Sequence, residues 1–212
     1  MAHYYSLHFF SNRPEAEPAV QHIGDFVSRD EAAAVIEKLK WKPEYADNQQ
    51  GFDLHECYTP KSDFVALAAS GDLPLVGSDE ADRNLRLLIA FTSDSDVSNR
   101  DWATMTLAMQ DIDTLEVRAA LRAAAEDSDV DVRAEALEGL AQRDKDLALP
   151  LVHRELAREE CGYGAFKAAL SLAHPSLLEG LRGWAGKSGT PWIDDEIKDA
   201  IAACEAAQAR RA

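Results

Sequence analysis

One stretch of the sequence recurs at a fixed distance, and this recurrence constrains the fold more than any other feature. Residues 93–111 read SDSDVSNRDWATMTLAMQD, and residues 126–144 read EDSDVDVRAEALEGLAQRD. Similarity at one fixed period is typical of proteins built from stacked supersecondary units. The two stretches align without a gap at an offset of 33, with these matches: Asp94/Asp127, Asp96/Asp129, Val97/Val130, Arg100/Arg133, Ala103/Ala136, Leu107/Leu140 and Ala108/Ala141.

Each recurring position has a physical role in a helix that starts inside the stretch. Asp96 and Asp129 are placed to cap the free N–H groups of a helix start, where negative charge also suits the helix dipole. Each alanine–leucine pair is four residues apart and therefore shares one helical face. Arg100 and Arg133 come about one turn later, within reach of an aspartate in an adjacent turn. The pattern predicts two similar helices with a structural motif of Asp96, Arg100, Asp129 and Arg133.

The pattern D-x-D-V-x-x-R-x-x-A-x-x-x-L, followed by a second helix, resembles the HEAT repeat in its short bacterial form, which also occurs in phycobilin lyases. The match is best over residues 94–157. A degenerate third copy lies at 162–174, where Ala165 replaces the arginine and Cys161 the capping aspartate. The resemblance implies an all-α fold, a right-handed α-solenoid of helix pairs. The alternative is an ordinary helical bundle whose turns are alike by chance.

The rest of the chain is expected to cap this stack at both ends. Residues 1–78 are interpreted as a divergent N-terminal helical cap, residues 79–186 as the HEAT-like repeats, and residues 187–212 as a C-terminal capping helix. Helices are predicted at 28–41 and 62–70, whereas 42–60 is rich in turn residues and has no helical period. The aromatic segment 3–10 fits one short strand or an irregular segment. Thr190 and Pro191 suit the start of the last helix.

Charge and composition exclude several classes of function. The formal net charge is −16, and no third of the chain is basic. A nucleic-acid partner is therefore not expected, because such proteins neutralise phosphates with clustered Lys and Arg. No segment approaches the ~20 apolar residues of a membrane span, and the three cysteines have no disulfide or zinc-ligand spacing. We expect a cytoplasmic protein without a membrane partner.

No motif in the sequence points to catalysis, a metal or a cofactor. The segment GKSGT at 186–190 ends like a phosphate-binding loop, but Leu181 stands where that motif needs glycine. HEAT-like hydroxylases bind iron through repeated His-Glu pairs, and here one such dipeptide occurs, His55-Glu56. The other histidines, among them His8, His22 and His174, follow no ligand spacing. We expect neither catalytic residues nor a metal site nor a cofactor.

A binding surface is predicted from the resemblance. In HEAT-like stacks the second helices line the concave face. The polar stripes of those helices contain the predicted partner-binding residues Arg118, Arg122, Glu126, Arg154, Glu155 and Arg158. The alternative is that these are solvated faces with surface ion pairs.

Together these features favour a non-enzymatic, acidic HEAT-like protein that binds another protein of basic charge. Small acidic repeat proteins of this type resemble bacterial immunity or inhibitor proteins and scaffolds, which bind a basic partner by electrostatic complementarity. A bilin lyase or chromophore chaperone is the alternative implied by the family resemblance, and an enzyme on a HEAT scaffold, such as a glycosylase or hydroxylase, is a third. The sequence leaves the identity of the partner and the oligomeric state open.

Overall fold

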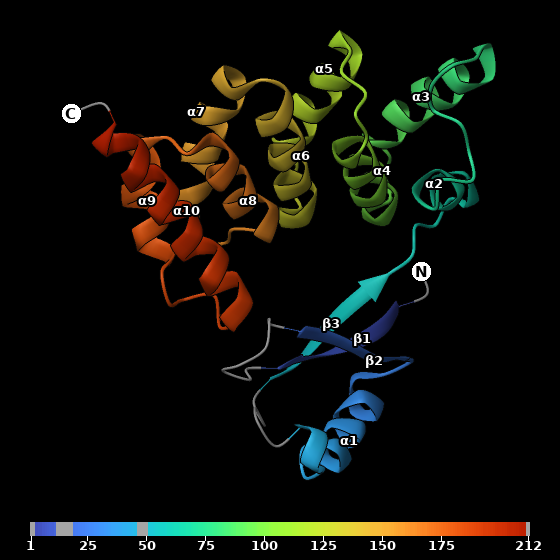
Figure 1. The fold of residues 1–212 in the computed structure, drawn as a ribbon. Helices are drawn as coiled ribbons and strands as arrows, with labels where there is room; N and C mark the ends of the chain where they lie inside the picture. Colours follow the sequence, from blue (N-terminus) through green and yellow to red (C-terminus); the bar gives the residue numbers. More distant parts are fainter. Residues whose placement is uncertain (1–2, 12–18, 46–50, 211–212) are drawn as a thin grey trace. The chain divides into compact units, whose positions relative to one another are not determined.

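The computed structural model describes residues 3–11, 19–45 and 51–210. The chain divides into two compact units, Met1–Thr59 and Pro60–Ala212. It is mostly helical, with one small sheet in the first unit (Figure 1).

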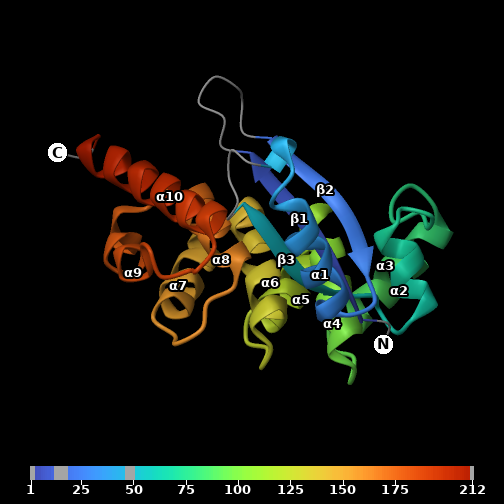
Figure 2. The same cartoon turned by 90° about the horizontal axis from the view of Figure 1, so that it is seen from below.

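The first unit is a three-stranded antiparallel sheet with a helix on one face. The strand order is β2-β1-β3, so the first strand is central. Helix α1 crosses one face of the sheet (Figure 2). Its start is capped as a capping box: the Ser28 hydroxyl accepts from the Glu31 amide, and the Glu31 carboxylate accepts from the Val27 amide. The elements are β1 (His3–Ser11), β2 (Ala19–Phe26), α1 (Arg29–Leu39), the 3-10 helix η1 (Pro43–Tyr45) and β3 (Phe52–Tyr58).

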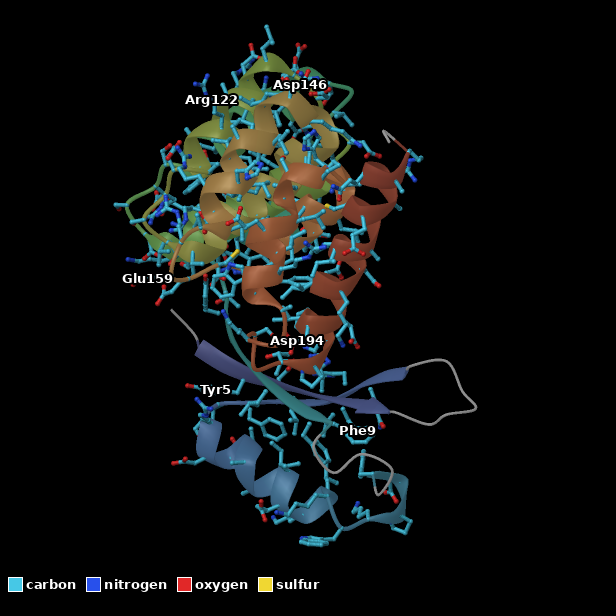
Figure 3. The ribbon with its side chains drawn as sticks, turned by 90° about the vertical axis from the view of Figure 1, so that its left-hand side faces the viewer. Tyr5, Phe9, Arg122, Asp146, Glu159 and Asp194 are labelled. Carbon is cyan, nitrogen blue, oxygen red and sulfur yellow. The ribbon has the colours of Figure 1, made fainter. Side chains whose placement is uncertain are left out.

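Alternation along β1 separates an apolar face from a polar one. Leu7 and Phe9 are buried on the side that faces α1, and Figure 3 shows Tyr5 and Phe9 pointing to that side. The ring of Tyr45 packs edge-on against Phe9 at 4.8 Å between centroids. This aromatic cluster and the buried Ala32 of α1 form the core of the unit.

The expectation of a helical cap over residues 1–78 was wrong in two respects. The described part of this segment contains three strands where at most one was expected, and β3 lies inside the turn-rich 42–60. The boundary between the two compact units also lies after residue 59 of the chain, not after residue 78, because α2 packs on α3 and α4. Short strands paired over a long sequence distance leave little local signal, and their pairing is decided by tertiary contacts.

The second unit consists of helices in two layers. Helices α4, α6, α8 and α10 pack successively on one another and form what we call the inner layer; α5, α7 and α9 cover its other side and form the outer layer (Figure 1). The elements are α2 (Asp63–Ala69), α3 (Asp79–Phe91), α4 (Val97–Met109), α5 (Leu115–Ala124), α6 (Val130–Arg143), α7 (Lys145–Leu156), α8 (Tyr163–Leu172), the 3-10 helix η2 (Pro175–Leu177), α9 (Leu178–Trp184) and α10 (Pro191–Ala209).

Small residues let the inner-layer helices approach closely. A Cβ added to Gly139 of α6 would lie 2.8 Å from the Cβ of Ala108 on α4, and one added to Gly164 of α8 would lie 2.5 Å from the carbonyl oxygen of Ala134 on α6. The outer helices α5 and α7 make much less contact with each other than these inner neighbours do. The inner layer is therefore the more closely packed of the two layers.

Candidate partner-binding surface

The recurring aspartates begin the helices of the inner layer. Asp96 is the N-cap of α4 and accepts from the Ser98 amide at 3.0 Å. Asp129 is the N-cap of α6 and accepts from the Asp131 amide at 3.0 Å. Gly162 occupies this position before α8 and makes no side-chain cap. The degenerate third copy therefore lacks the cap that defines the first two.

The recurring arginines join one helix pair to the next. Nε and Nη2 of Arg100 donate to the two carboxylate oxygens of Asp127 at 2.8 and 3.0 Å, and Nη1 donates to the carbonyl of Asp94 at 3.1 Å. Burial opposes ionisation of Asp127, but its bonds with Arg100 and the Asp129 amide keep its pKa below the usual value. The first arginine thus bridges two successive turns of the stack.

The second arginine takes a different partner. Arg133 donates to the carbonyls of Asp127 and Ser128, as Arg100 does in its own turn, but its Nε and Nη2 both bind Glu155 at 2.9 Å. The side chains of Arg133 and Glu155 are only 6% and 3% exposed. Glu155 was predicted to bind a partner. This prediction was wrong, because its carboxylate forms a buried ion pair with Arg133 inside the second unit.

Most of the other predicted binding residues also pair within the unit. Arg154 of α7 binds Glu126 at the end of α5, and Arg118 of α5 binds Asp113 at 2.6 Å and Asp144 at 3.0 Å. The Arg154–Glu126 and Arg118–Asp144 ion pairs link successive helix pairs.

The two remaining arginines are exposed. Arg158 binds Glu155 through Nε at 2.9 Å. Arg122 makes no ion pair with the residues that the structure describes, and its side chain points away from the helices (Figure 3). Along α5 and α7, Arg122 is the predicted residue that stays available to a partner.

The predicted partner-binding residues and the closely packed inner layer belong to different helices. The predicted residues lie on α5 and α7 or just beyond their ends, in the outer layer, whereas the closely packed layer consists of α4, α6, α8 and α10. Small residues at Ala108, Ala134, Gly139 and Gly164 bring the inner-layer helices α4, α6 and α8 close together, and in the outer layer Gly180 of α9 makes a similar close approach to Leu156 of α7.

An acidic strip runs across the inner layer. We define it as Asp101 of α4, Asp131, Glu135 and Glu138 of α6, and Glu196 of α10. Lys167 of α8 binds Glu138 and lies 5.5 Å from the centre of the Tyr163 ring. The Tyr163 hydroxyl donates to Glu196 at 3.1 Å, and its ring packs edge-on against Trp192 at 4.6 Å. These contacts connect the strip from α6 through α8 to α10.

The carboxylates of the strip repel one another. Burial, followed by the charges of Asp101 and Glu138, raises the pKa of Glu135 to about 7, although Lys167 opposes the shift. Burial and the neighbouring Glu196 raise the pKa of Tyr163 to about 12, so its hydroxyl stays protonated and acts as a donor. The neighbouring carboxylates thus disfavour ionisation of Glu135, and an external cation at the strip would favour it.

The sequence contained a signal for the strip that the prediction did not use. Asp131, Glu135 and Glu138 are spaced i, i+4, i+7, which places them on one helical face. The resemblance instead predicted the partner-binding residues on α5 and α7. The helical period of these carboxylates could be read from the sequence, but the side of the stack on which they lie could not.

A shallow depression of about 440 Å³ lies where α7 ends beside the turn before α6. It is lined by Ser128, Arg133, Ala157, Arg158, Glu159 and Glu160. Among its charged residues, Glu159 and Glu160 are exposed, and the guanidinium of Arg133 already has four oxygen partners. The residues that line this depression therefore do not indicate a ligand-binding site.

No helix within the described residues is both long and apolar enough to cross a membrane. Nor do three or more His, Cys, Asp or Glu side chains form a ready metal-binding group anywhere in the part of the chain that the structure describes.

Comparisons with known proteins assign no family to the chain. No protein-family model and no curated protein matches the sequence. Among solved structures, YibA from Escherichia coli is similar at 21% sequence identity, with a TM-score of 0.45; the match covers 82% of this chain and 63% of YibA. The chain thus spans less than two thirds of the length of YibA. A similarity of this size does not establish a function for this chain.

Proposed function

We propose that the chain is a non-enzymatic binding protein that holds a basic segment of another protein against the acidic strip of its inner layer. One observation supports this: the strip crosses three of the inner helices, and the charges of Asp101 and Glu138 help raise the pKa of Glu135 to about 7. A partner that brings Lys or Arg side chains to the strip would relieve this repulsion. The partner would gain from the same contacts, because complementary potentials steer association and fix its register.

The scaffold that we propose is a right-handed solenoid of HEAT-like helix pairs. Support comes from the fixed offset between the two motif stretches and from the recurring turn, in which an aspartate caps the helix and an arginine donates to the preceding carbonyls. Solenoids of this kind present extended curved surfaces for docking. An inhibitor of the immunity type or a scaffold for a basic protein would use such a surface.

The proposal is tested with a partner candidate and two variants of equal net charge. The candidate is the most basic protein encoded by a reading frame adjacent to that of this chain, titrated calorimetrically into the tag-free protein. The inner-layer variant is D131K/E135K, and the matched outer-layer variant is E116K/D146K, which makes the same charge change on exposed positions of α5 and α7.

We expect the inner-layer variant to weaken binding by at least about tenfold, since like charges at an interface cost several kcal/mol. The outer-layer variant should bind within about threefold of the wild type, because rim charges act mainly on the association rate. Equal loss in both variants would show that only net charge matters, and full binding by the inner-layer variant would refute the proposed surface.

A further inference from the structure

The polar face of the sheet brings together two histidines that are far apart in the sequence. His8 of β1 and His22 of β2 are paired across the antiparallel ladder, with ring centroids 5.1 Å apart and the rings tilted by 51°. Nε2 of His22 lies 3.0 Å from a carboxylate oxygen of Asp25, and Nε2 of His8 lies 3.1 Å from the hydroxyl of Ser6. Each imidazole is therefore held in place by a second polar side chain.

A β-bulge creates this cluster. Leu7 is paired with Gly24, but the next residue, His8, is paired with His22, so that Ile23 is an extra residue in β2. Without the extra residue, strict alternation would put His22 and Asp25 on opposite faces of the sheet. Bulges often re-aim a side chain next to a functional site, and this one turns His22 to the same face as His8 and Asp25.

The distances fit two imidazoles that share one metal ion. With a metal–nitrogen distance of 2.0–2.1 Å and tetrahedral angles, two ligating rings have their centroids roughly 5 Å apart. Metal-binding histidines usually donate their second ring N–H to a carboxylate, which fixes the tautomer. The Asp25 carboxylate lies 3.0 Å from Nε2 of His22, so a neutral His22 donates to it from Nε2. Nδ1 of His22 then carries the lone pair.

We propose that His8 and His22 are ligands of a divalent transition-metal site of the zinc type, and that Asp25 orients His22 as a positioning residue. Because three ligating side chains do not yet converge among the described residues, water or an additional group must complete the coordination. The third strand runs beside these positions: His55 and Asp53 are the Cα partners of Ser6 and His8 in the β1–β3 ladder. Imidazole nitrogen suits zinc, copper and nickel better than magnesium or calcium.

A second histidine pair in the chain supplies a matched control. His153 of α7 and His174 both contact the hydroxyl of Ser176, at 2.7 and 2.6 Å, so a hydroxyl lies between the two rings. The partner that these two rings share is a hydroxyl, whereas His22 contacts the carboxylate of Asp25. If any two surface histidines sufficed for metal binding, both pairs would contribute equally.

The test uses the full chain without a histidine tag, stripped with a chelator and titrated with Zn²⁺ by calorimetry and with Co²⁺ by visible absorption. We expect one ion per chain and a Co²⁺ spectrum of low coordination number. The variant H8Q/H22Q should bind at least about tenfold more weakly, H153Q/H174Q should bind like the wild type, and D25N should lose about tenfold in affinity while both ligands remain. Circular dichroism establishes that each variant is folded.

A readout on the unmodified protein keeps the test decisive if H8Q/H22Q fails to fold. In NMR spectra of the wild type, one equivalent of Zn²⁺ should shift the imidazole signals of His8 and His22 and leave those of His153 and His174 in place. The proposal is overturned if the wild type binds no Zn²⁺ at millimolar concentration, if H8Q/H22Q binds normally, or if the ion shifts only the other pair.

Discussion

Arg133 and Glu155 form a buried, two-point ion pair that ties the first turn of α6 to the last turn of α7. A buried pair of this kind adds little net stability compared with an apolar pair, because both charges lose their hydration. Removing one partner is different, because it leaves the other charge buried and uncompensated. The pair therefore makes the joint between two helices sensitive to a single substitution.

We expect Glu155→Ala to lower the free energy of unfolding by about 3–5 kcal/mol, since Arg133 would remain buried without its carboxylate. Urea denaturation measures this. Glu159→Ala, an exposed neighbour, is the control and should stay within about 0.5 kcal/mol of the wild type. The double variant R133M/E155L should be more stable than Glu155→Ala alone; a double variant as unstable as the single one would contradict this account.

Gly164 sets the distance between α6 and α8. A Cβ there would lie 2.5 Å from the backbone carbonyl oxygen of Ala134, which cannot rotate away as a side chain could. We expect Gly164→Ala to reduce the melting temperature and to cost about 1–3 kcal/mol through overpacking. Gly183 of α9 has no atom within 4 Å of an added Cβ, so Gly183→Ala should be neutral or stabilising by up to about 1 kcal/mol. Equal effects at the two glycines would argue against the close seam.

Arg143, at the end of α6, donates hydrogen bonds to backbone carbonyls at and just beyond the end of α4. Its guanidinium donates to the carbonyl oxygens of Leu107, Ala108, Gln110, Ile112 and Gly139. Hydrogen bonds to a charged group contribute about 1.5–3 kcal/mol, so Arg143→Ala should destabilise the chain by at least that amount. The exposed Arg122→Ala, measured in the same denaturation series, should change stability by less than about 0.5 kcal/mol. Hydrogen exchange should also show faster opening at the C-terminal end of α4 in Arg143→Ala only.

Glu135 makes stability depend on pH near neutrality. Its folded-state pKa of about 7 lies above the ordinary value of 4.5, so the folded chain binds this proton more tightly than the unfolded chain does. The resulting stability is fully present below pH 4.5 and is lost as the pH rises through 7. Asp101, Asp131 and Glu138 oppose ionisation of Glu135, and Lys167 favours it.

The variant Glu135→Gln should therefore lose less stability than the wild type between pH 5 and pH 8, as measured by urea denaturation at both values. In the wild type, the side-chain carbon signal of Glu135 should titrate with a midpoint near 7. A midpoint near the ordinary glutamate value would remove both this prediction and the main support for the proposed binding surface.

Local features of the sequence determined where the helices of the second unit begin and which of their faces is buried. Asp96 and Asp129 cap α4 and α6 because a short carboxylate can reach the free amides of the first turn whatever surrounds it. Leu107 and Leu140 are fully buried, as expected for residues that share a face with an alanine four positions earlier. Such effects act within one or two turns, so a single sequence is enough to read them.

Tertiary structure decided the relations between segments far apart in the chain. The bulge at Ile23, the choice of Glu155 as the partner of Arg133, and the close packing of α6 on α4 each depend on contacts between residues at least 14 positions apart in the chain. A strand's register and a helix's neighbour are selected by the fit of whole surfaces, which no local propensity encodes. The sequence by itself therefore determined the helices and their caps, and only packing decided which charges are buried in pairs and which are left for a partner.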